Sequence, residues 1–111
     1  MQLNINGRTV ELSENGWMEN MAEWDEAIAA AIAERVEKVD MTDEHWTIIK
    51  ESRAYFDEFG TVPEMRQFSK LMKEKYGAER STQQYFYGLF PHGLIKSANK
   101  IAGLPRPKGC S

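Results

Sequence analysis

The chain contains a single cysteine, Cys110, which stands one residue before the end of the 111-residue sequence. Sulfur chemistry requires the thiolate form of cysteine, and neighbouring cations increase the population of that form. Lys108 and Arg106 lie two and four residues before Cys110, and no acidic residue follows Glu79. Residue type and spacing therefore favour a reactive thiol, and an incidental cysteine in a disordered end of the chain is the alternative.

The segment that carries this thiol is predicted to be an extended arm. Pro105 and Pro107 disfavour a helix and favour a stiff, polyproline-like path. Gly103, immediately before this segment, is placed to end a final amphipathic helix. We therefore expect one domain over residues 1–103 and a flexible C-terminal arm over residues 104–111.

The beginning of the chain predicts a β-hairpin. Leu3 and Val10 belong to two short runs in which apolar and polar residues alternate, and Asn6-Gly7 lies between the runs. Both central residues of a type I′ turn need positive φ, which explains the preference for Asn-Gly at such a position. A third short strand is expected at Trp17.

Apolar spacing predicts helices over the remainder of the chain. One helical stripe starts at Trp24, and Thr42 is expected to cap a second helix that Gly60 ends. Pro63 is expected in the first turn of the next helix. The predicted fold class is α+β and mostly helical. A small N-terminal β-meander or hairpin packs on a helical array, and an extended C-terminal arm follows.

The charges are unevenly distributed along the chain. All seventeen acidic residues and nine of the fourteen basic residues lie within residues 1–79. The five remaining basic residues are Arg80, Lys96, Lys100, Arg106 and Lys108. This asymmetry predicts that the C-terminal segment meets an acidic partner, and the alternative is that it neutralises the acidic body of the same chain.

Other kinds of chemistry lack the residues they need. One cysteine excludes an intramolecular disulfide, and His45 and His92 have no spacing typical of a metal site or of a Cys-His catalytic pair. We expect no cofactor and no metal. The sequence has no apolar run of about 18 residues and no signal peptide, so we expect a cytoplasmic protein with no membrane partner.

One alternative concerns residues 42–76, where two helices and a short turn could form a helix-turn-helix. Arg66, Gln67, Lys70 and Lys73 would then face the DNA groove. The same unit carries many acidic residues, and DNA readers are normally more basic. A DNA-binding protein with an incidental cysteine therefore stays an alternative.

The C-terminal residues 100–111, which read KIAGLPRPKGCS, resemble the terminal signature of the DsrC/TusE family of sulfur-relay proteins. Asn6-Gly7 in the hairpin and Glu44-His45-Trp46 at a helix start also occur in the order of that family. The resemblance covers nearly the whole chain. It implies a small β-meander packed on helices, a mobile C-terminal arm, and a penultimate cysteine that carries sulfur as a persulfide.

The resemblance also implies partners. In the TusE branch the cysteine accepts sulfur from the TusBCD complex and passes it to the tRNA thiouridylase MnmA. The carrier itself is therefore only an indirect partner of tRNA. In the DsrC branch a second cysteine, eleven residues upstream, also takes part, and the partner is dissimilatory sulfite reductase. The corresponding position here is Asn99. The single thiol favours the TusE-like role, and a DsrC-like partner or regulator of sulfite reduction or sulfur oxidation is the alternative.

The expected site therefore has two kinds of residue. The family motif identifies Cys110 as the persulfide carrier. Charge and spacing add Arg106, Lys108, Lys100 and Lys96, which would stabilise the thiolate and steer the arm towards an acidic surface. Such a protein is a sulfurtransferase through one carrier residue rather than through a multi-residue catalytic site.

Overall fold

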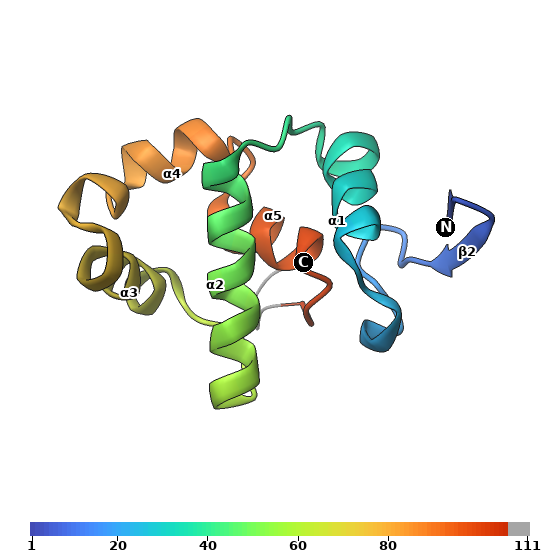
Figure 1. The fold of residues 1–111 in the computed structure, drawn as a ribbon, viewed down its shortest axis with the longest axis horizontal. Helices are drawn as coiled ribbons and strands as arrows, with labels where there is room; N and C mark the ends of the chain where they lie inside the picture. The colour runs from blue at the N-terminus through green and yellow to red at the C-terminus, as the bar shows by residue number, and fades with distance from the viewer. Residues whose placement is uncertain (107–111) are drawn as a thin grey trace.

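The computed structural model describes residues 1–106 and places the longest helix, α2, near the middle of the molecule (Figure 1). Helices α3 and α4 lie on one side of α2, and α1 with the N-terminal hairpin lies on the other. In chain order the helices are η1 (Met21–Glu23), α1 (Glu26–Ile32), η2 (Ala33–Glu37), α2 (Asp43–Phe59), α3 (Met65–Tyr76), η3 (Ala78–Arg80), α4 (Gln83–Leu89) and α5 (Leu94–Ile101).

The hairpin forms as the sequence predicts. Strands β1 (Gln2–Ile5) and β2 (Arg8–Glu11) are antiparallel, and Asn6 and Gly7 have φ values of 48° and 81°. Leu3 pairs with Val10, and both side chains are buried. The alternation of the two runs therefore places one face of the hairpin on the helices.

The expected third strand is reduced to one isolated bridge, between Leu12 and Met18. The chain turns away soon afterwards, because the side chain of Asn20 accepts a hydrogen bond from the N–H of Ala22 and starts η1. Within the described residues the sheet has two strands.

Helix α2 begins and ends where the sequence predicts. Thr42 is its N-cap, and the backbone N–H of Thr42 donates to Nδ1 of His45 at 3.0 Å. Gly60 ends the helix with φ of 70°. Because Nδ1 of His45 accepts, Nε2 carries the proton and donates to the carbonyl oxygen of Leu89 at 2.8 Å. His45 therefore joins the start of α2 to the end of α4.

A second contact joins the same two helices. The hydroxyl of Tyr85 in α4 donates to a carboxylate oxygen of Glu44 in α2 at 2.8 Å. Burial and this hydrogen bond raise the pKa of Tyr85 to about 12. The neutral, donating form of the phenol is therefore kept over a wider pH range than in an exposed tyrosine.

Two predicted helix starts differ from the structure. Helix α1 begins after Trp24, because a carboxylate oxygen of Asp25 accepts from the backbone N–H of Ile28 and caps the helix. Helix α3 begins after Pro63, because the next residue, Glu64, is its N-cap. A local capping residue determines the first turn in both cases.

Helix α5 is the central packing element, since it contacts α1, α2 and α4. The predicted fold class, α+β and mostly helical, is confirmed. None of the helices in residues 1–106 is both long enough and apolar enough to cross a bilayer. The largest fully buried side chains are Phe68, Phe86, Phe90, Leu12, Ile28, Ile32, Ile48, Ile49, Met72, Ile101, Val10 and Asn99.

Candidate functional site at the base of the C-terminal arm

The predicted arm leaves the folded body at the C-terminal end of α5. Gly103 has φ of 71°, and its N–H donates to the carbonyl oxygen of Lys100 at 3.1 Å. The N–H of Leu104 donates to the carbonyl oxygen of Asn99 at 2.9 Å, which completes a glycine-based helix end. Leu104 is buried, so the described core extends one residue beyond the predicted boundary at residue 103.

Two side chains from distant parts of the chain bind this helix end. The indole Nε1 of Trp24 donates to the carbonyl oxygen of Ile101 at 2.8 Å, and Nη1 of Arg53 donates to that of Ala102 at 2.6 Å. Both carbonyls belong to the last turn, where the helix itself supplies no donor. The path of the chain into Gly103 is therefore determined by tertiary hydrogen bonds.

Trp24 and Arg53 also contact each other. The guanidinium carbon of Arg53 lies 3.8 Å from the centroid of the Trp24 ring, a cation–π geometry. Burial lowers the pKa of Arg53, and Asp57 opposes this shift, yet a guanidinium stays protonated in proteins. The two side chains thus contact each other, and both bind the end of α5 from which the predicted arm starts.

A buried ion pair involves Lys100 in the last turn of α5. Nζ of Lys100 is 3.0 Å from a carboxylate oxygen of Glu37, and the hydroxyl of Ser97 donates to the other oxygen. The side chains of Lys100 and Glu37 are only 4% and 8% exposed. Glu37 reaches this position at the end of η2, a π-helical turn that continues α1.

The aromatic ring of Trp17 joins the buried pair to the first residues of the arm. Nζ of Lys100 lies 5.5 Å from its centroid, and the guanidinium carbon of Arg106 lies 6.0 Å from it. The indole Nε1 of Trp17 is buried and has no hydrogen-bond partner within residues 1–106. The ring thus contacts one buried and one exposed cation.

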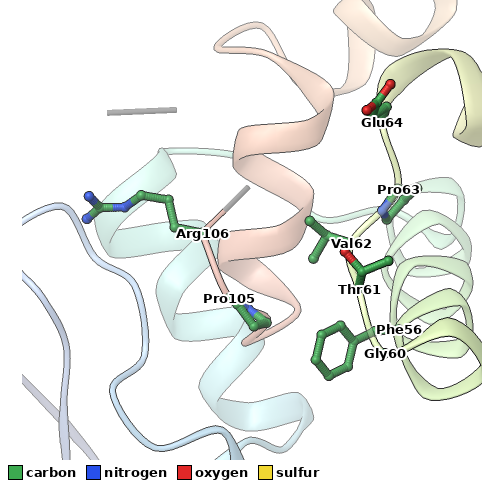
Figure 2. Close-up of a pocket in the computed structure, with 8 residues that line it drawn as sticks. All are labelled: Phe56, Gly60, Thr61, Val62, Pro63, Glu64, Pro105 and Arg106. Carbon is green, nitrogen blue, oxygen red and sulfur yellow. The ribbon is translucent and has the colours of Figure 1, made fainter. Parts of the chain in front are cut away.

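A cavity of about 380 Å³ opens on the other side of the arm base. Figure 2 shows Pro105 on the side of this cavity that faces Phe56, whereas the side chain of Arg106 extends away from the loop at Thr61 and Val62. The remaining lining residues are Gly60, Pro63 and Glu64.

The structure places the predicted site residues in different environments. Cys110 and Lys108 lie outside the described residues, so the prediction for them stays a prediction. Arg106 and Lys96 are exposed to solvent. Lys100 is buried with Glu37, so its charge is already neutralised within the protein.

Several residues of this region were not identified from the sequence. Trp17, Trp24 and Glu37 reach it from segments more than 60 residues away along the chain. Arg53 carries one local signal, since it interrupts an apolar stripe of α2. A cation inside an otherwise apolar stripe indicates a buried or half-buried partner, which here is the carbonyl oxygen of Ala102.

Asn99 occupies the position eleven residues before Cys110. Its side chain is fully buried in α5, and neither its amide nitrogen nor its amide oxygen has a partner within the described residues. The position at which a second cysteine is expected in the DsrC branch therefore holds a buried amide and no thiol.

Comparison with known proteins assigns the family. The family described as "DsrC like protein" matches residues 4–111. The chain belongs to this family. It is 41% identical over 108 residues to "Sulfurtransferase TusE" of Yersinia pestis, covering 97% of this chain and 98% of that protein. It is 38% identical over 104 residues to "Sulfurtransferase TusE" of Escherichia coli strain K12, covering 94% of each.

Solved structures of the DsrC-like family share the fold. The NMR structure of DsrC from Allochromatium vinosum superposes with a TM-score of 0.88 at 34% identity, covering 99% of this chain and 97% of that one. The crystal structure of the oxidized gamma-subunit of the dissimilatory sulfite reductase (DsrC) from Archaeoglobus fulgidus gives a TM-score of 0.87 at 38% identity over the whole of both chains.

Proposed function

We propose that the protein is a sulfur-relay carrier that accepts persulfide sulfur on Cys110 and passes it to a tRNA 2-thiouridine-forming enzyme. One observation carries the proposal: the only thiol of the chain lies within the segment matched to the family, and curated relatives about 40% identical are named sulfurtransferases. A TusBCD-like complex would be the donor and an MnmA-like thiouridylase the acceptor, both in the cytoplasm.

The transfer needs only thiol–persulfide exchange. The Cys110 thiolate attacks the outer sulfur of a donor persulfide, the sulfur–sulfur bond of the donor breaks, and the donor leaves as a thiolate. A thiolate of the acceptor then attacks the outer sulfur now held on Cys110, and the Cys110 thiolate is released. Each step exchanges one sulfur–sulfur bond for another, so no external oxidant or reductant is consumed.

The cations near the arm divide into two roles in this proposal. Arg106 and Lys96 are exposed and available to an acidic partner, and Lys108 lies two residues from the thiol. Lys100 is paired with Glu37 inside the fold, so we assign it to holding α5 and the arm base in place. The thiolate-stabilising role proposed for Lys100 is therefore indirect.

The test is intact-mass spectrometry after incubation with a cysteine desulfurase, its upstream sulfur carriers and cysteine. We expect the protein to gain the mass of one sulfur atom, and a reductant to remove it. Cys110→Ala is the matched control, and it should gain nothing because no other thiol is present. An unmodified wild-type protein, with its thiol shown to be free beforehand, would contradict the proposal for this donor set.

A second candidate is a DsrC-like partner of dissimilatory sulfite reductase. The superposition on the gamma-subunit of that enzyme from Archaeoglobus fulgidus favours it. Asn99 argues for the carrier role, because the DsrC branch uses a second cysteine at this position and this chain has none. Affinity capture with purified partners separates the two: retention of a thiouridylase supports the carrier, and retention of sulfite reductase alone supports the second candidate.

A further inference from the structure

A second surface lies away from the arm, where α3 packs beside α4 at one end of the molecule (Figure 1). A groove of about 590 Å³ runs between these helices, and we call it the basic groove. No carboxylate is found among its described lining residues, which are Met65, Arg66, Ser69, Lys70, Lys73, Gln83 and Phe86. The groove is therefore lined by three cations and by the apolar side chains of Met65 and Phe86.

The three cations of the groove form one stripe. Arg66, Lys70 and Lys73 are spaced i, i+4 and i+7 on α3, so they share one face of the helix. All three are exposed, and none has an ion-pair partner within residues 1–106. Like charges at this spacing repel one another, so an anion bound in the groove would relieve an unfavourable interaction.

Neighbouring cations behave differently. Nζ of Lys75 lies 2.9 Å from a carboxylate oxygen of Glu51, and Nε of Arg80 lies 3.8 Å from one of Glu44. Both of these cations are therefore paired with acidic residues of α2. Among the cations of α3 and η3, those that line the groove are therefore the ones without such a pair.

The floor of the groove and its rim supply apolar contacts. Met65 is half-buried, and Phe86 forms part of the floor although its side chain is almost fully covered. The groove adjoins a second hollow, since Gln83 lines both, and Tyr87 in that hollow is 68% exposed. Exposed tyrosines and methionines are typical anchors of protein interfaces.

The basic groove is too limited in extent for a long polyanion. Glu64 lies at the N-terminal end of α3, Glu74 lies near its C-terminal end, and Glu79 follows in η3, and all three are exposed. A nucleic-acid duplex carries one charge per about 1.7 Å and would extend past the stripe to these carboxylates. Gln67, which the helix-turn-helix alternative needs on the same face, instead accepts a hydrogen bond from the Tyr55 hydroxyl.

The groove begins next to the cavity at the arm base. Glu64 lines the cavity beside Pro105, and Met65, the next residue, lines the basic groove. A protein that receives the arm can therefore contact the groove as well.

We propose that the basic groove is a docking site for an acidic, amphipathic segment of a protein partner. Carboxylates of the segment would pair with Arg66, Lys70 and Lys73, and its apolar side chains would rest on Met65 and against Tyr87. This surface contains none of the residues of the sulfur-transfer step, so it goes beyond the carrier function.

The test uses full-length protein and a defined probe. A fluorescein-labelled peptide of about 12 residues, rich in glutamate and with leucines at i and i+4, is titrated by fluorescence anisotropy at low salt. We expect saturable binding that weakens with added salt, because exposed charges are screened over about 8 Å at physiological ionic strength. Arg66→Gln with Lys70→Gln should lower the affinity by about tenfold or more.

The matched control removes the same amount of charge elsewhere. Lys38 and Lys50 are exposed and lie outside the groove, so Lys38→Gln with Lys50→Gln should bind the peptide as the wild type does. Cys110→Ala should also bind normally, which separates this test from that of the carrier function. Circular dichroism confirms that each variant is folded.

Four results would overturn the proposal. The first is that the wild-type protein does not bind the peptide at low salt, and the second is that Lys38→Gln with Lys50→Gln loses as much affinity as Arg66→Gln with Lys70→Gln. The third is that a peptide with glutamine in place of glutamate binds equally well. The fourth is that unfractionated tRNA binds more tightly than the peptide and loses its affinity in the Arg66→Gln, Lys70→Gln variant, which would assign the groove to nucleic acid.

Discussion

Lys100 illustrates how a charge can support a site without facing it. Its ammonium group pairs with Glu37, whose other carboxylate oxygen accepts a hydrogen bond from Ser97, and only 4% of the Lys100 side chain is exposed. Taking two charges out of water is costly, and the cost is recovered only through good geometry and further hydrogen bonds. The pair therefore ties the end of η2 to α5, directly before the chain turns into the arm.

The first prediction concerns this pair. Lys100→Met leaves the Glu37 carboxylate buried without its cation, so the free energy of unfolding should fall by about 3–5 kcal/mol. Urea denaturation followed by circular dichroism measures the change. Lys96→Met is the control, because Lys96 is exposed on the same helix and its replacement should change stability by less than about 0.5 kcal/mol. Equal effects of the two substitutions would contradict the structural role of the pair.

At the scale of elements, the end of α5 depends on close approach to Trp24. A Cβ atom on Gly103 would lie 2.4 Å from Cδ1 of the indole, and the φ of 71° is itself unfavourable for other residues. Gly60 has a nearly identical φ of 70°, but a Cβ there would meet nothing within 4 Å. The two glycines therefore separate backbone strain from side-chain contact.

The second prediction uses that difference. Gly60→Ala should destabilise the protein by about 1 kcal/mol through backbone strain alone. Gly103→Ala should cost about 1–3 kcal/mol more, because the indole of Trp24 must move and its hydrogen bond to Ile101 is disturbed. Unfolding free energies from urea titration give the difference, and equal losses for the two variants would exclude a specific contact with Trp24.

Elements whose ends are determined locally could be predicted from the sequence. Asn6-Gly7 forms its turn, Thr42 caps α2 and Gly60 ends it, since each requires only neighbouring residues. The start of α1 was misplaced because Trp24 fits the apolar spacing, whereas Asp25 makes the cap. The hydrogen bond between that indole and α5 spans 77 residues along the chain, and no local pattern contains it.

The same division between local and distant determinants holds for the candidate site. The thiol, its cationic neighbours and the family motif are properties of one short segment, so the sequence identifies them. The burial of Lys100 depends on Glu37, which lies 63 residues earlier. The sequence therefore predicts that Lys100 is available to a partner, whereas in the structure it is paired with Glu37.

At the scale of the whole molecule, the basic residues of the C-terminal segment divide into ion-paired and exposed ones. Arg80 and Lys100 contact Glu44 and Glu37 of the acidic body, so part of the basic C-terminal segment neutralises its own chain. Arg106 and Lys96 are exposed. Self-neutralisation therefore holds for Arg80 and Lys100, whereas an acidic partner for Arg106 and Lys96 stays a prediction.

The third prediction concerns cooperativity across the molecule, whose longest dimension is 41 Å. The hairpin and α3 lie at opposite ends (Figure 1), but α5 contacts α1, α2 and α4 and links the two ends through one core. Val10 is buried in the hairpin, so Val10→Ala should lower the global stability by about 2 kcal/mol. If unfolding is two-state, the slowest-exchanging amides of α3 must lose the same free energy of protection, although none of them contacts the hairpin. Hydrogen exchange measured by NMR under native conditions tests this, and a loss of protection confined to the hairpin would show instead that the two ends unfold as separate units.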